Sequence, residues 1–336
     1  MRTFRELKYL ALKKAYRAVP IRWWGSLANA PLLVPLYHLV SDEPVPHVSH
    51  LYQCRTTLEF ERDLDFFLTH FDAVGLDEVI ASAENPSPAR RPRPRFHLTF
   101  DDGFREQSDI VAPILRRKGI PASFYLATSF LDNASMAHRN KVSLLIDHLA
   151  GGVPGPTLRK IEETLGSSSV STDLVSRMLA IPWSERARVD TIAEILAFDV
   201  GGYLRSARPY LTTEQVRALR NRGFGIGAHS CDHPFYGDIP LPEQESQTRE
   251  SMKLVEAIVG EPTRAFAFPF GSDRVLPEFF ANVFAGGELK VMFGTDGLIR
   301  HFNPRNLPRV IMEQGDRTAT DILTAEYVRA FKHRLR

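Results

Sequence analysis

The chain has 336 residues, 43% of them hydrophobic and 24% charged, so it can form one large α/β domain or two ordinary ones with a substantial core. Its 42 Lys and Arg residues nearly balance its 40 Asp and Glu residues, and the net charge of +2 argues against a dedicated nucleic-acid-binding protein. The two cysteines, Cys54 and Cys231, are too few for a framework of disulfides, which fits a reducing compartment and leaves a single bridge open.

The N-terminal segment, residues 1–30, is basic, and Lys and Arg residues interrupt each apolar run that could serve as a signal peptide. We therefore expect a cytoplasmic protein. Because Leu7, Leu10, Trp23 and Trp24 are interspersed with the basic residues, the segment predicts a helical extension. This helix either lies on a membrane surface or packs on the domain that follows. No apolar run in the sequence approaches the ~18 residues needed to cross a bilayer.

The first part of the predicted domain alternates strands and helices. An apolar run at residues 31–40 predicts a buried strand, and His38 near its end is a candidate site residue. Thr57 is a candidate cap for a helix with an apolar face, and residues 71–82 predict a further strand and helix. Residues 84–95, rich in Pro and Arg, predict a surface connection.

Two adjacent carboxylates follow the next predicted strand. Residues 96–100 alternate apolar and polar side chains, Asp101 and Asp102 come directly after them, and Gly103 allows a turn into a helix over 104–118. This places both Asp residues at the edge of the sheet where α/β proteins build their sites. Adjacent carboxylates repel each other, and a bound cation or a shared proton relieves that repulsion.

After a strand at 122–127, residues 130–210 are mostly helical and predict an insertion, which is either a lid or substrate-selecting subdomain or a purely structural one. The alternation then returns, with helices at 213–221, 242–259, 277–284 and 318–333 and strands at 224–228, 265–268, 290–293 and 307–312. Seven or eight strands separated mostly by helices favour an α/β barrel over a small open sheet.

His229 and His233 follow the strand at 224–228 and are four residues apart, a spacing that lets both imidazoles face one cation. A chance surface pair is the alternative. One carboxylate and two imidazoles form a ligand set that leaves positions open for water and substrate, as a hydrolytic metal site requires.

These residues resemble the motifs of the polysaccharide deacetylases, the NodB-homology carbohydrate esterases. Thr99–Gly103 is similar to the first motif, the segment from His229 to Pro234 to the second, and Arg264–Gly271 to the third. The resemblance covers residues 31–128 and 211–312 and implies a distorted (β/α)7–8 barrel over 31–336, interrupted by the insertion at 130–210.

The resemblance implies roles at matching positions. Asp101 is expected to be the general base, and Asp102, His229 and His233 to hold a divalent metal, usually zinc in this family, with cobalt, nickel, iron or manganese as alternatives. The metal would polarise an amide carbonyl and position water, and the Phe270 backbone N–H would stabilise the oxyanion.

Two departures from the family pattern lead to further predictions. The C-terminal strand has no Leu-x-His motif to supply the general acid, but Leu36-Tyr37-His38 has one near the N-terminus. Such a permuted order resembles the biofilm poly-N-acetylglucosamine deacetylases and makes His38 the candidate acid, with a core histidine as the alternative. Ala267 replaces the Arg that usually orients the base, so Arg309 or Arg264 is expected to take over that role, unless each forms only a surface salt bridge.

The predicted function is therefore metal-dependent removal of N-acetyl groups from an amino sugar or glycan intermediate. Two alternatives stay open: an amide hydrolase or deformylase acting on a lipid-linked sugar, and an inactive carbohydrate-binding barrel. The two Asp and two His residues argue against the last, because a binding module does not need them together.

Overall fold

A computed structural model describes residue 21 and residues 32–85, 93–166 and 173–335. Nearly all of the predicted N-terminal helix, residues 1–30, lies outside these ranges, as do the middle of the connection at 84–95 and residues 167–172. Within the described ranges, the helices are too short or too polar to span a bilayer.

Eight parallel strands form the main sheet, which curls into a barrel. In spatial order they are β10 (Asn306–Leu307), β9 (Val291–Phe293), β8 (Ala265–Ala267), β7 (Gly225–Ala228), β6 (Ala122–Leu126), β5 (Leu98–Phe100), β2 (Pro35–Tyr37) and β11 (Val310–Ile311). The two edge strands, β10 and β11, are consecutive in the chain and are separated only by Pro308 and Arg309. The sheet therefore begins and ends in one short segment, which confirms the predicted distorted barrel.

A second parallel sheet of three strands extends the base of the barrel, in the order β1 (Leu32–Leu33), β4 (Arg95–Phe96) and β3 (Asp72–Ala73). The chain passes from this sheet into the barrel at His97, whose imidazole is buried and contacts the Val74 carbonyl and the Ser123 hydroxyl. His97 thus has a structural position beneath the carboxylates that follow β5.

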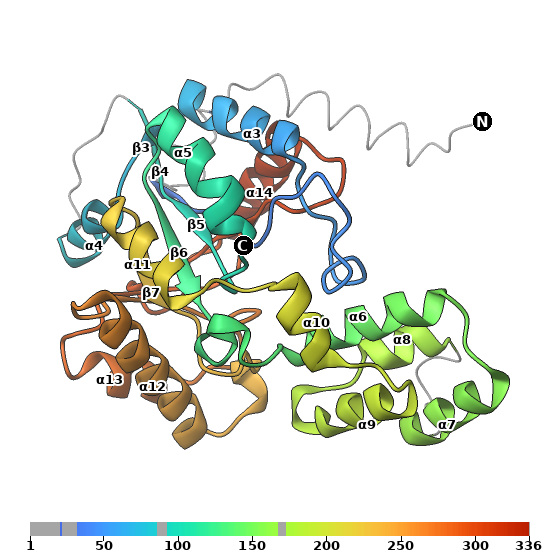
Figure 1. The fold of residues 1–336 in the computed structure, drawn as a ribbon. Coiled ribbons are helices and arrows are strands. Elements are labelled where there is room, and N and C mark those ends of the chain that lie inside the picture. The colour runs from blue at the N-terminus through green and yellow to red at the C-terminus, as the bar shows by residue number, and fades with distance from the viewer. Residues whose placement is uncertain (1–20, 22–31, 86–92, 167–172, 336) are drawn as a thin grey trace.

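Helices pack around the barrel (Figure 1). They are α3 (Thr57–His70), α4 (Leu76–Glu84), α5 (Ala112–Lys118), α11 (Thr213–Asn221), α12 (Leu241–Val259), α13 (Pro277–Phe284) and α14 (Ala319–Arg334). Capping boxes begin α3, with Thr56 and Glu59, and α11, with Thr212 and Gln215. The cap of α3 is therefore Thr56, and the prediction of Thr57 was wrong by one residue. A π-helical turn, η1 (Gln107–Val111), leads into α5, so the predicted helix at 104–118 begins later than expected.

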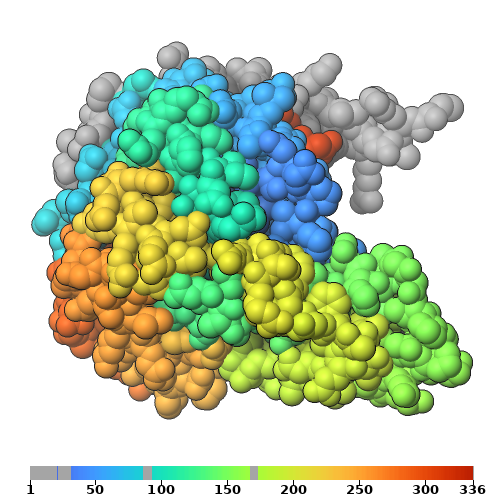
Figure 2. Space-filling model, in the orientation of Figure 1, coloured from blue at the N-terminus to red at the C-terminus, as the bar shows by residue number. Residues whose placement is uncertain are grey.

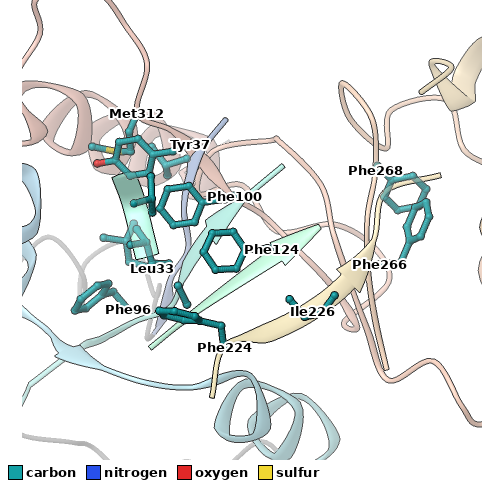
Figure 3. Packing of buried hydrophobic residues seen from close by; sticks show 14 of the residues in the cluster. Leu33, Tyr37, Phe96, Phe100, Phe124, Phe224, Ile226, Phe266, Phe268 and Met312 are labelled. Atoms are coloured by element: carbon teal, nitrogen blue, oxygen red, sulfur yellow. The ribbon is translucent and has the colours of Figure 1, made fainter. Parts of the chain in front are cut away.

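Aromatic side chains fill much of the space between the sheet and the helices. Tyr37, Phe100 and Phe124, on three neighbouring strands, stack with centroid distances of 5.8 and 5.1 Å (Figure 3). All three are fully buried. This packing fixes the ends of β2, β5 and β6 relative to one another, and the ends of β2 and β5 carry predicted site residues.

The predicted insertion leaves the barrel after β6 and a 3₁₀ turn, η2 (Thr128–Asn133), and returns at α11. It contains α6 (His138–Ala150), α7 (Gly155–Leu165), α8 (Leu174–Leu179), a 3₁₀ turn η3 (Trp183–Glu185), α9 (Ala187–Ile195) and α10 (Val200–Ala207). These helices share an apolar cluster of their own and form a lobe beside the barrel (Figures 1 and 2). Because the lobe departs from the carboxyl end of β6, it lies at the end of the barrel where the site is formed.

Candidate active site

The carboxyl ends of several barrel strands carry the predicted site residues, and the backbone there is strained. Asp102, Ser230, His233 and Phe270 have left-handed φ values of 71°, 65°, 58° and 62°. Residues other than glycine adopt this conformation uncommonly, and such positions concentrate at functional sites. Gly103, at φ 74°, completes the turn after the two Asp residues.

The predicted metal ligands converge. The Asp102 Oδ1 atom lies 3.0 Å from His233 Nε2 and 3.3 Å from His229 Nε2. One ligand atom from each of the three residues lies within 4.8 Å of the other two. Burial opposes the ionisation of Asp102, but the neighbouring His233 and His229 outweigh it and hold the pKa of this carboxyl well below its ordinary value. The carboxylate is therefore available as an anionic ligand.

The hydrogen bonds around this cluster favour a metal over a network of side chains. His229 Nδ1 is 2.8 Å from the Ala267 carbonyl, so Nδ1 carries the proton and Nε2 presents a lone pair. The Asp102 Oδ1 atom is buried and, within the described structure, makes no contact of hydrogen-bond geometry despite its two close nitrogen neighbours. Three potential ligand atoms gathered within 4.8 Å of one another fit a divalent cation with open coordination positions.

Polar side chains hold the loop between the two histidines. The Ser230 hydroxyl accepts a hydrogen bond from the His233 N–H at 3.0 Å. Gln247, on α12, accepts hydrogen bonds from the Cys231 and Asp232 backbone N–H groups. These bonds satisfy backbone groups that the irregular loop would otherwise leave unpaired.

Asp101, the predicted base, is 1% exposed and pairs with Arg309. Both terminal nitrogens of the guanidinium donate to the two carboxylate oxygens at 2.7 Å, while Arg309 Nε donates to the Gly294 carbonyl at 3.0 Å. Burial opposes ionisation of Asp101, but Arg309 and then His229 outweigh it and lower the pKa of the carboxyl. Asp101 is thus held ionised in an almost water-free position.

Arg264, the other arginine proposed to orient Asp101, lies at the start of β8, the opposite end from the site. It pairs with Asp77 on the surface, and both side chains are exposed. The structure therefore brings Arg309 to Asp101 and does not bring Arg264 there. The C-terminal segment of the predicted third motif does reach the site, because the Phe270 ring packs edge-on against His233 at 4.7 Å. The Phe270 backbone N–H makes no hydrogen bond to another described residue.

His38 lies level with Asp101 on the neighbouring strand. In the register of β2 and β5, Tyr37 pairs with Phe100, and the Asp101 N–H donates to the Tyr37 carbonyl at 3.0 Å. Burial alone would lower the pKa of His38, but the Glu313 carboxylate, aided by Asp102 and Asp101, raises it to about 9. This pKa favours the imidazolium form of His38 at neutral pH, next to the Asp101 carboxylate.

Glu313 follows β11 and is a site residue that the sequence analysis missed. Its Oε2 atom is 2.5 Å from His38 Nδ1, and its Oε1 atom accepts from the backbone N–H groups of His38 and Leu39 at 2.8 and 2.9 Å. The side chain is 1% exposed. Because Glu313 occupies Nδ1, it orients the ring so that Nε2 is left for the substrate side.

Two further residues complete the surroundings of His38. The Gln107 amide donates to the carbonyls of His38 and Asp101 at 3.0 and 2.5 Å, tying the ends of β2 and β5 together. The Tyr52 ring packs 5.0 Å from that of His38. Neither residue stands in a recognisable motif, although the start of a helix just after the double Asp is a signal that could have pointed to Gln107.

The chain is similar to known proteins in sequence and in fold. A family model described as polysaccharide deacetylase matches residues 89–278, more than half of the chain, including Asp101, Asp102, His229 and His233. The matched range excludes His38 and Glu313. A sequence comparison with curated proteins finds no match.

Several solved structures share the fold. The Streptococcus pyogenes deacetylase PplD, in complex with acetate, is 14% identical with a TM-score of 0.55, over 87% of this chain and 96% of that one. IcaB from Ammonifex degensii is 15% identical with a TM-score of 0.52, over 88% and 96%. A de-N-acetylase from Aggregatibacter actinomycetemcomitans is 13% identical with a TM-score of 0.52, over 89% and 99%. At these identities the comparison shows the fold, which extends well beyond the range of the family model.

Proposed function

Because the chain belongs to the polysaccharide deacetylase family, we propose that Asp101 and His38 are its general base and general acid and that Asp102, His229 and His233 hold its metal. The family consists of hydrolases that remove N-acetyl groups from carbohydrates and are generally metal-dependent. The observation that carries the assignment is the convergence of three ligand atoms within 4.8 Å, beside a carboxylate that Arg309 keeps ionised.

The donor set, one carboxylate oxygen and two imidazole nitrogens, suits zinc best among the candidate divalent metals. When bound, such a metal supplies Lewis-acid polarisation of the acetamide carbonyl and activation of water. His229 is prepared for this role, since the Ala267 carbonyl fixes its tautomer.

Asp101 accepts a proton from the water that attacks the carbonyl carbon. Its pKa is lowered, so it is ionised at neutral pH, and the paired Arg309 fixes the orientation of both carboxylate oxygens. The Phe270 N–H, which has no acceptor among the described residues, is the donor proposed for the oxyanion.

His38 donates a proton to the nitrogen that leaves. This role requires the imidazolium form, which the pKa of about 9 provides, and a fixed ring orientation, which the contact with Glu313 provides. The products are acetate and a free amino group on the sugar.

The substrate is proposed to be an acetylated amino sugar or a glycan intermediate that contains one. Release of acetate from a panel of neutral, nucleotide-linked and lipid-linked N-acetylated sugars, with zinc or cobalt present, tests this proposal. Acetate release in wild type, and release at least about 100-fold slower in Asp101→Asn, is expected. No release from the whole panel would refute it, and release of formate instead would favour the deformylase alternative.

The site of action is part of the same proposal. The proposed place is the cytoplasm, and the proposed substrate there is a nucleotide- or lipid-linked sugar. The basic residues 1–30 would suit a lipid-linked one, and liposome flotation with and without these residues tests whether they bind membranes.

A further inference from the structure

The helical lobe places an arginine beside the metal ligands. Arg139 lies in the first turn of α6, and its guanidinium is 5.9 Å from the centre of the Phe270 ring. That ring in turn packs edge-on against His233 at 4.7 Å and is 44% exposed. A single aromatic ring therefore separates Arg139 from a metal ligand, and solvent reaches that ring.

Arg139 has no carboxylate partner among the residues that the structure describes. Its one hydrogen bond within the described residues runs from Nη1 to the Leu179 carbonyl at 3.2 Å. Burial lowers its pKa, as expected for a cation that has lost part of its hydration without gaining a counter-ion. Two other cations of the lobe do have carboxylate partners: Lys141 pairs with Asp190, and Arg188 with Glu185 at 3.0 Å. Arg139 is the one of these three that lies next to the site.

A second arginine of the lobe also lacks a carboxylate within ion-pair distance in the described ranges. Arg186 lies over the Trp183 ring with its guanidinium carbon 3.8 Å from the ring centre. The Trp183 indole N–H donates to the Asp232 carbonyl at 3.2 Å, so this pair is attached to the loop between the two histidine ligands.

His138, next to Arg139 in the chain, shows which charged groups surround this part of the site. It is 7% exposed, and its Nδ1 atom has no hydrogen-bond partner in the described part of the chain. Burial lowers its pKa, and His233, Arg139 and Arg186 each lower it further, while no carboxylate raises it. Two guanidinium groups, those of Arg139 and Arg186, therefore lie near this corner of the site, and within the described ranges neither forms an ion pair with a carboxylate.

We propose that Arg139, supported by Arg186, binds an oxyanion of the substrate, a phosphate or a carboxylate attached to the acetylated amino sugar. This inference rests on the proposed deacetylase function and narrows its substrate class to anionic sugars. A guanidinium presents parallel N–H donors that match either oxyanion, whereas a neutral sugar at this place would offer hydroxyl oxygens as acceptors but no negative charge to balance the cation.

Steady-state kinetics with three substrates tests the proposal: neutral di-N-acetylchitobiose, N-acetylglucosamine 1-phosphate and N-acetylmuramic acid. The last two substrates show whether the bound oxyanion is a phosphate or a carboxylate. We expect wild type to have a higher kcat/KM for at least one anionic substrate than for the neutral one. Arg139→Gln should reduce that ratio by about 10- to 100-fold, and Arg139→Lys by less, because charge-assisted hydrogen bonds contribute about that much discrimination.

Arg188→Gln is the matched control, since it removes a lobe arginine that already has a carboxylate partner. Its ratio of kcat/KM for the anionic to the neutral substrate should equal that of wild type. Calorimetry of N-acetylglucosamine 1-phosphate and N-acetylmuramic acid with metal-free protein supplies a readout independent of turnover. Binding of the preferred anion should weaken in Arg139→Gln and persist in Arg188→Gln.

An unchanged ratio in Arg139→Gln would overturn the inference, as would an equal loss for neutral and anionic substrates, which would mean that Arg139 only supports Phe270. Thermal unfolding midpoints show whether Arg139→Gln is folded. If it is not, the kcat/KM ratio of Arg139→Lys decides between the two outcomes. Absence of turnover with every substrate would instead refute the deacetylase proposal. Anion binding by calorimetry that depends on Arg139 would still support the anion site.

Discussion

The contact between Glu313 and His38 makes a sharp prediction about the pH dependence of the reaction. His38 has to be protonated to act as an acid, so activity should fall as the pH rises through its pKa. Glu313 raises that pKa from 6.5 to about 9 against the opposing effect of burial. The rise corresponds to roughly 3 kcal/mol of preference for the imidazolium, taking about 1.4 kcal/mol for each unit of pKa.

Glu313→Gln removes the negative charge and keeps the shape of the side chain. Burial still disfavours the imidazolium, and of the anions that favour it only Asp102 and Asp101 remain, so the pKa of His38 should fall towards its ordinary value of 6.5. At that value about a tenth of His38 would be protonated at pH 7.5, and kcat/KM would decrease about tenfold from this cause alone. A bound metal would lower the pKa of His38 in wild type and in Glu313→Gln alike. The prediction therefore concerns the difference in this pKa between the two proteins.

The assay is acetate release from pH 5.5 to 10, with kcat/KM plotted against pH. The alkaline limb should move to lower pH in Glu313→Gln, disappear in His38→Gln and stay in place in Glu84→Gln, which removes a surface partner of Lys290. A variant Glu313→Gln with the alkaline limb of wild type would refute the reasoning, because the limb would then belong to another group.

Three further predictions concern the base, the metal and the buried arginine. Asp101→Asn should lower kcat by about 100- to 10,000-fold while binding one equivalent of zinc, whereas His229→Ala should lose the metal, both measured by metal analysis after dialysis. Zinc at 100 times its Kd should stabilise wild type by about 2.7 kcal/mol in urea unfolding, and a chelator should reverse this; stabilisation of His229→Ala by the same amount would contradict the site. Arg309→Met should cost about 3–5 kcal/mol of unfolding free energy because it leaves the Asp101 carboxylate buried and unpaired, while Arg264→Met, at an exposed pair, should cost about 1 kcal/mol or less. Equal losses in the two arginine variants would show that the burial of the pair contributes nothing.

The motifs near the strand ends made part of the site predictable. Asp101, Asp102, His229 and His233 each follow a strand whose apolar pattern is visible in the sequence, and parallel strands bring such residues to one edge. His38 could be placed for the same reason.

Residues that act through long-range contacts were not predictable in this way. Glu313 meets His38 only because β11 pairs with β2, a register between chain ends 275 residues apart. For the same reason, periodicity could not decide between Arg309 and Arg264, since both stand beside a short strand. The two arginines differ in the end of the barrel at which they lie. That end depends on whether a residue precedes or follows its strand, which periodicity does not show. The short strands were also hard to delimit: the predicted strand at 307–312 is divided by Pro308 and Arg309.

That division has a mechanical consequence. Arg309 occupies the junction where the two edges of the sheet meet, and its guanidinium joins Gly294, after β9, to Asp101, after β5. The ionised state of Asp101, the proposed base, therefore depends on the place where the two edges of the sheet meet. We expect that lengthening the segment between β10 and β11 would separate Arg309 from Asp101 and weaken proton transfer at the proposed site.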